Sequence, residues 1–160
     1  MGSLRQLVRA YDAQPVKLLP TLKTSAGFDL VIASPAGRNQ ASAMHIFGRI
    51  DATWPALCEA ELPDLWPRSL SAPAMLWLIL ARVLWRLGRG TNCENYLAFI
   101  QRSEDCADAL IEQTQQNQRI AVVGHAFTNR AIGKALLANG FQRLSRHGSG
   151  HWATTRFARS

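Results

Sequence analysis

One short segment limits the choice of fold more than any other part of the sequence. Residues 119–124 (Arg-Ile-Ala-Val-Val-Gly) contain a continuous apolar run that is too hydrophobic for a strand with one face in solvent. Gly124-His125 follows as a tight turn, and residues 128–137 have the pattern of a helix that Gly140 closes. A buried strand that leads directly into a helix is a unit of a parallel sheet. The segment therefore predicts an α/β fold.

The rest of the chain supplies further strands and helices for such a fold. Residues 28–33 form a second apolar run, and a helix that includes Arg38 is expected to begin at Ser34-Pro35. Four prolines between residues 50 and 73 rule out long helices there and indicate an excursion over the surface. Residues 151–157 alternate as a final edge strand would. Three more helices are expected, at residues 3–13, 74–87 and 95–116. We predict three layers, α/β/α, around a mostly parallel sheet.

Composition defines the broad class of protein. The chain has 160 residues, 48% hydrophobic and 18% charged, which fits one globular domain over residues 1–160 and excludes a disordered chain. The three cysteines form no CxxC pair, which argues against structural zinc and a disulfide framework and favours a cytoplasmic location. The most apolar window, within residues 74–87, is too short to cross a bilayer and contains two arginines. We therefore expect no membrane partner.

The positive charge is concentrated in the last third of the chain. Residues 113–160 contain Arg and Lys but no Asp or Glu, and they account for the whole net charge of +7. Such a segment can bind nucleic acid, a membrane surface or a small phosphorylated ligand. Its cations are dispersed, however, and no recognised nucleic-acid motif or stacking platform accompanies them. We therefore expect a small phosphorylated molecule or phosphate as the partner, with nucleic-acid binding as a weaker alternative.

Two predicted strand ends carry side chains that suit a phosphate. Arg38 is placed in the first turn of the helix that follows residues 28–33, where helix amides and a guanidinium together bind anions. His125 directly follows the strand at 119–124. Either residue alone is more often a solvated or structural side chain. Ligands of open α/β sheets bind beyond the carboxyl ends of the strands, so one pocket can use both residues.

Four pieces of the sequence, by their order and spacing, resemble the histidine phosphatase (phosphoglycerate mutase-like) superfamily. They are Ser34-Pro-Ala-Gly-Arg38-Asn-Gln-Ala-Ser-Ala43, Leu57-Cys-Glu59-Ala-Glu61-Leu-Pro63, Cys93-Glu94-Asn95 and Val122-Val-Gly-His125-Ala-Phe-Thr-Asn-Arg130. The resemblance implies phosphomonoester hydrolysis or phosphoryl transfer through a phosphohistidine, with no metal and no cofactor. It also implies roles for individual residues. Arg38 and His125 would bind the phosphate, and Glu59 would act with His125 in catalysis by protonating the leaving group, with Glu61 in reserve.

The sequence departs from this family at the residue that would accept the phosphoryl group. The family has that histidine in an Arg-His-Gly motif at the end of its first strand, and this chain has no such motif. Leu7-Val-Arg9-Ala10-Tyr11 is superficially similar but has Ala10 at the nucleophile. We interpret this segment as a later helix, which would put Met1 downstream of the first strand. The remaining histidines, His45, His147 and His151, are poorly placed to substitute.

Two functional hypotheses follow from this departure. The first is a histidine phosphatase family protein whose phosphate binding survives in part and whose catalysis is impaired. The alternative is a non-catalytic module that binds a phospho-ligand or a protein at the remnant pocket.

Loss of the first strand also has a structural consequence. That strand would be central, so strands 28–33 and 120–123 are expected to lack a neighbour and to expose backbone groups and apolar surface. Such a sheet invites instability or a homodimer. The apolar helix at 74–87, with Trp77 and Trp85, is a candidate for the dimer contact, although core packing explains it better.

Overall fold

The computed structural model describes residues 27–61, 63, 74–89, 93–148 and 152–159. Three parallel strands form one sheet in the order β2-β1-β3: Leu30–Ala33 (β1), Ala52–Thr53 (β2) and Ile120–Val123 (β3). An antiparallel hairpin forms a second sheet from Phe141–His147 (β4) and Thr154–Arg159 (β5). The helices are Gly37–Phe47 (α2), Ala74–Arg86 (α3), Tyr96–Gln113 (α4) and Ala126–Ala138 (α5), with a 3-10 turn, η2, at Pro55–Leu57.

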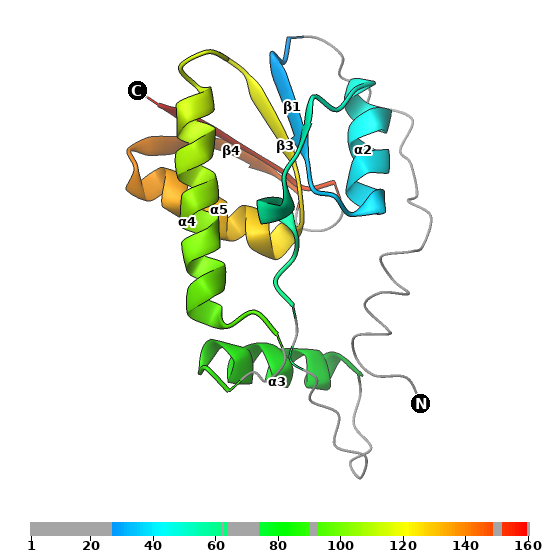
Figure 1. Ribbon diagram of the computed structural model, residues 1–160, viewed down its shortest axis with the longest axis vertical. Helices are drawn as coiled ribbons and strands as arrows, with labels where there is room; N and C mark the ends of the chain where they lie inside the picture. The colour runs from blue at the N-terminus through cyan, green and yellow to red at the C-terminus, as the bar shows by residue number, and fades with distance from the viewer. Residues whose placement is uncertain (1–26, 62, 64–73, 90–92, 149–151, 160) are drawn as a thin grey trace.

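The parallel sheet lies between two layers of helices (Figure 1). Val31 and Ala33 of β1 pack on one face with Ala43 of α2. Ile32 points to the opposite face and packs with residues of α4 and α5, including Ile132. Successive strand residues point to opposite faces, so a strand covered on both sides must be apolar throughout. The predicted α/β/α class with a parallel sheet is confirmed.

Most predicted elements lie where they were expected. Helices α3 and α4 match the predicted helices at 74–87 and 95–116 to within a turn. Helix α5 begins at Ala126, before the predicted position, because the extended backbone of His125 makes it the N-cap. Gly140, with a φ of 85°, follows the end of this helix as predicted. The helix predicted at 3–13, which includes Ala10, lies outside the described residues.

One prediction about the strands was wrong, and one strand was missed. Strands 28–33 and 120–123 do not lack a neighbour, because β1 and β3 pair with each other along their whole length, from Leu30↔Ile120 to Ala33↔Val123. This pairing satisfies backbone groups that would otherwise be buried without partners. The strand that the sequence analysis missed is β2, at the start of the excursion at 50–73. Asp51 fixes that strand against β1, as its carboxylate accepts a hydrogen bond from Val31 N at 2.7 Å.

The C-terminal segment is a hairpin and not a single edge strand. The sequence analysis missed β4, because most of its side chains are polar and exposed. The hairpin packs against α5, where a Cβ built on Gly133 would lie 2.8 Å from Cζ of Phe157. The absence of a side chain at Gly133 therefore lets the hairpin approach the helix closely.

The outer edge of β3 has no partner strand among the described residues. Val123 O accepts a hydrogen bond from Ser34 N at 2.9 Å, so the backbone groups of Val123 face β1. Successive residues of a strand point their N–H and C=O groups in opposite directions. The groups of Ile120 and Val122 therefore point away from β1, towards this unpaired edge.

Helix α3 supplies part of a small aromatic core. Trp77 and Trp85 are 7% and 0% exposed, which confirms core packing for both side chains. The Trp85 ring contacts Tyr96, Phe99 and Phe127 in edge-on arrangements. None of the helices within the described ranges is long and apolar enough to span a membrane.

Candidate functional site

The carboxyl ends of β1 and β3 lie side by side and define one edge of the sheet. Ala33 is in register with Val123, so the chain leaves the two strands at Ser34 and Gly124 next to each other. Each strand leads into a helix, α2 or α5, that begins at this edge. A Cβ on Gly124 would lie 2.6 Å from Oδ1 of Asn129, so a larger residue in this turn would displace the Asn129 side chain.

Both helices present their N-termini at this edge. The N-caps, Ala36 and His125, make no side-chain hydrogen bond to the first turn of their helix, and neither first turn contains an acidic residue. The first amides of a helix have no partner within the helix, and the helix dipole adds positive potential there. Two such ends on neighbouring parallel strands give an edge that favours an anion.

The structure brings the two predicted phosphate ligands to this edge. Arg38 lies in the first turn of α2, and His125 is the N-cap of α5. Both residues are partly buried. They come from helices that follow neighbouring strands in the sheet, which is the arrangement that the sequence predicted for a shared pocket.

Glu59 reaches the same region from the segment that follows η2. Thr128, in the first turn of α5, donates hydrogen bonds to Cys58 O at 2.9 Å and to Oε1 of Glu59 at 3.2 Å. The Ala60 amide also donates to Oε1 of Glu59, at 3.1 Å. The Cys58 Sγ lies 4.0 Å from Oγ of Ser34, at the end of β1. Glu59 is therefore fixed beside both strand ends, whereas Glu61 is exposed.

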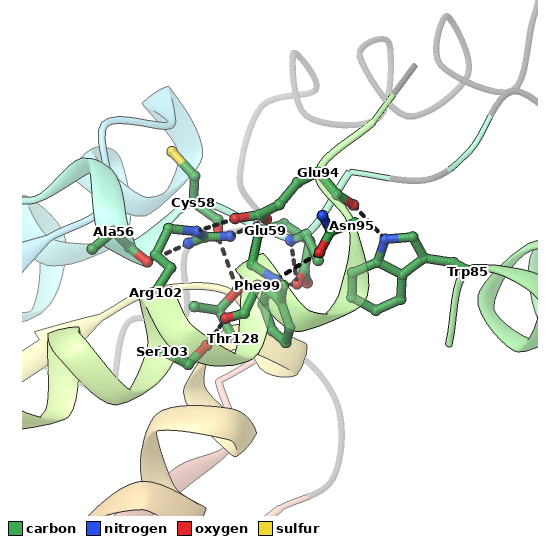
Figure 2. Close-up of polar contacts among 12 residues, drawn as sticks. Ala56, Cys58, Glu59, Trp85, Glu94, Asn95, Phe99, Arg102, Ser103 and Thr128 are labelled. Carbon is green, nitrogen blue, oxygen red and sulfur yellow. Dashed lines mark hydrogen bonds and ion pairs between the residues drawn. The ribbon is translucent and has the colours of Figure 1, made fainter. Parts of the chain in front are cut away.

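A partly buried arginine from α4 holds this segment in place (Figure 2). Arg102 donates through Nε and Nη2 to the two carboxylate oxygens of Glu94, both at 2.7 Å. Its Nη1 donates to the carbonyls of Ala56 and Cys58. The hydrogen bonds to Glu94 raise the pKa of Arg102. Arg102 thus joins α4 to η2 and to the residue that follows it, and it fixes the position of Glu59 indirectly.

Sequence reasoning missed Arg102 and gave Thr128 no role. Glu94 and Thr128 both lie within the motif pieces. The spacing of those pieces does not show that Glu94 contacts Arg102 or that Thr128 contacts the segment after η2. The contacts of Arg102 join residues 8, 44 and 46 positions apart, so no helical periodicity could have found them.

The other histidines do not lie at this edge in the described part of the chain. His45 is in the last turn of α2, at the opposite end from Arg38. His147 is exposed at the end of β4, and His151 lies outside the described residues. Within the same described ranges, no group of three His, Cys, Asp or Glu side chains could hold a metal ion.

The fold is that of an α/β protein with two helix N-termini at one edge of its parallel sheet, and the comparisons identify its family. The chain matches the model of the histidine phosphatase superfamily (branch 1) over residues 12–159, and it belongs to that superfamily. This confirms the resemblance found in the sequence. No curated protein sequence matches the chain significantly.

Solved structures of similar fold include enzymes of this superfamily. A putative α-ribazole-5′-P phosphatase from Escherichia coli is 25% identical, with 88% of this chain and 77% of that chain covered and a TM-score of 0.56. The α-ribazole phosphatase from Shigella flexneri is 24% identical, with coverages of 98% and 83% and a TM-score of 0.56. The product of an open reading frame from Mycobacterium tuberculosis is 15% identical, with coverages of 81% and 69% and a TM-score of 0.52.

Proposed function

We propose that this protein binds a small phosphomonoester at the common edge of β1 and β3. Arg38, His125 and the first amides of α2 and α5 hold the phosphate, and Glu59 faces the leaving group. The observation that carries the proposal is the register of β1 and β3, which puts the two helix starts side by side, with Glu59 attached to one of them through Thr128. Cationic and N–H donors in this arrangement suit the charge of a phosphoryl group.

We propose further that phosphoryl transfer is impaired in this chain. The mechanism of the family forms a phosphohistidine, and this chain lacks the Arg-His-Gly motif that would supply the nucleophile. Binding does not need that nucleophile, so it can survive without turnover. The Escherichia coli neighbour is described as acting on α-ribazole-5′-P, and this compound is the first natural phosphomonoester to test here.

We propose that the protein is located in the cytoplasm. Cys58, Cys93 and Cys106 all lie in the described part of the chain, and no disulfide joins them. This is the usual state of cysteines in a reducing compartment.

The test combines ligand binding with turnover. Calorimetry would measure the affinity for inorganic phosphate and α-ribazole-5′-P, and hydrolysis of an aryl phosphate near pH 6 would measure catalysis. We expect saturable binding that weakens about tenfold or more in Arg38→Ala and His125→Ala, since each change removes a charge-assisted contact. Arg143→Gln, an exposed cation on β4, is the matched control and should leave affinity unchanged.

The outcomes separate the competing hypotheses. Binding without turnover supports the proposal. Turnover that His125→Ala abolishes would show that catalysis is intact and that another residue has taken over the nucleophile. Absence of phosphate binding, together with DNA or RNA affinity that falls steeply with salt, would favour the nucleic-acid alternative instead.

A further inference from the structure

An open groove runs along α4, on the outside of the molecule, where this helix faces η2 (Figure 1). It has a volume of about 530 Å³. One wall consists of residues that share one side of α4: Ala98, Gln101, Arg102, Asp105, Cys106 and Ala109. The other wall is formed by Trp54, Pro55 and Ala56. Most of these side chains are small or apolar, and no described residue of the β4-β5 hairpin lines the groove. The groove is therefore open to another molecule.

The α4 side of this groove is acidic. Asp105 lies in its wall, and Glu104, Asp108 and Glu112 are exposed beside it on the same helix. Residues three and four positions apart are neighbours on a helix surface, so these carboxylates form one row. The ion pairs within the described ranges involve other residues, so no described cation is paired with this row. The groove thus fits an apolar side chain that is accompanied by cations.

Strand β4 presents a side chain of this kind. Its pairing with β5 is irregular between Arg143 and Ser145, so Leu144 is an extra residue with no partner across the hairpin. Such a bulge turns a side chain out of the regular alternation of the strand. Leu144 is 61% exposed, and Arg143 and Arg146 on either side of it are also exposed. Neither arginine forms an ion pair with a described residue.

We propose that the hairpin of one copy of this chain binds in the α4 groove of a second copy. Leu144 enters the groove, and Arg143 and Arg146 lie against its acidic row. A second copy is the partner because each chain carries both surfaces, with opposite charge, and its own hairpin does not line its own groove. The contact also gives a role to cations of residues 113–160 that take no part in the proposed phosphate site. It does not depend on that site, because neither surface contains the phosphate ligands or Glu59.

The two kinds of contact contribute differently. Moving a leucine side chain from water into an apolar groove is favourable, whereas exposed ion pairs add little affinity and are screened by salt. Complementary charge instead steers the encounter and disfavours wrong partners. One hairpin in one groove is small beside a standard interface of about 1,600 Å². We therefore expect weak and reversible association that salt weakens further.

Sedimentation equilibrium of the full chain tests the proposal. We expect the average mass to rise as the protein is concentrated from about 10 to about 500 µM at low salt, and to rise less at about 0.5 M salt. An average mass that stays at that of one chain over the whole range would overturn the proposal.

Two variants assign the association to these surfaces. Leu144→Glu puts an acid against the acidic row, and Asp105→Arg puts a cation against the arginines of the hairpin. Each should weaken association about tenfold or more. The controls are Leu97→Ser, at an exposed position of α4 outside the groove, and Arg86→Gln on α3, and both should associate like the wild type. Melting curves of each variant identify loss of folding.

A mixture of the two variants separates this contact from any other. Leu144→Glu keeps an intact groove and Asp105→Arg keeps an intact hairpin, so the mixture should associate about tenfold more tightly than either variant alone. If both variants associate like the wild type, the copies use another surface, such as the outer edge of β3, and the proposal fails. If the mixture associates no better than its components, the hairpin does not bind the groove, and the proposal fails as well.

Discussion

At the scale of single residues, the position of Glu59 does not depend on a ligand. Thr128 and the Ala60 amide both donate to Oε1 of Glu59, and Arg102 binds the carbonyl of Cys58 immediately before it. The carboxylate is thus held directly by α5 and its own backbone and, through Cys58, by α4, with no ligand present. A group that is already oriented loses little conformational entropy when a ligand binds, which is the advantage of a preorganised site.

Thr128 gives a direct test of this network. Thr128→Val keeps the shape of the buried side chain but removes its hydrogen bonds to Cys58 and Glu59. We expect the free energy of unfolding to fall by about 1 kcal/mol, because Arg102 still satisfies the Cys58 carbonyl. Urea denaturation would measure the change. The control is Thr114→Val at an exposed C-cap, whose effect should stay within about 0.5 kcal/mol. Equal effects for both variants would contradict the prediction.

Cys106 predicts a specific loss of stability at alkaline pH. Burial raises the pKa of its thiol from 9.0 to about 11, with a smaller opposing effect of Arg102. Between these values the unfolded chain loses the proton and the folded chain retains it, so stability falls as the pH rises. Below pH 9.0 the thiol is protonated in both states and contributes no pH dependence.

Urea denaturation at several alkaline pH values would reveal this contribution. The wild-type protein should lose more stability over this range than Cys106→Ala does. Parallel curves for the two proteins would show that the Cys106 thiol does not titrate differently on folding.

At the scale of elements, the sequence was informative where the signal is local. The apolar runs of β1 and β3, and the turns that end them, could be identified because strands buried on both faces are apolar at every position. The mainly polar strand β4 has no such signature. The pairing of β1 with β3 joins residues 90 positions apart, and no local pattern specifies a contact of that separation. Arg38, His125 and Glu59 were predicted from motifs. Arg82 and Arg102 instead donate hydrogen bonds to the carbonyls of Ala60 and Ala56, which are distant from them in the sequence.

The contact between α5 and the hairpin can be tested at Gly133. In a free helix Gly→Ala stabilises by about 1 kcal/mol, but here the new Cβ would meet the Phe157 ring. We expect Gly133→Ala to destabilise the wild-type protein and to stabilise Phe157→Ala, in which the ring is gone. A double-mutant cycle by thermal denaturation measures this reversal of sign.

A matched substitution checks the helix contribution alone. Nothing lies within 4 Å of a Cβ built on Gly37, at the start of α2, so Gly37→Ala should be neutral or slightly stabilising in either background. If Gly133→Ala has the same effect with and without the Phe157 ring, the hairpin does not pack on α5 as described.

At the scale of the whole molecule, the site is assembled by the sheet. At the edge of β1 and β3, one helix begins after β1 and another after β3. Arg102 of α4 donates to the carbonyl of Cys58 and Arg82 of α3 to that of Ala60, so both helices hold the segment after η2. No single element contains the site. Its parts are brought together by the parallel pairing of two strands that are distant in the sequence.

The outer edge of β3, which has no partner strand among the described residues, makes the stability of this protein depend on which strands in solution can pair with it. Any strand that pairs with Ile120 and Val122 there binds the folded state only, and so it acts as a stabilising ligand. If a second copy supplies that strand, the melting temperature should rise as the protein is concentrated from about 1 to about 100 µM, in line with mass action. A melting temperature that does not change with concentration would show that no second copy uses this edge. The same law means that an added peptide able to pair with β3 would raise the melting temperature in proportion to the logarithm of its own concentration.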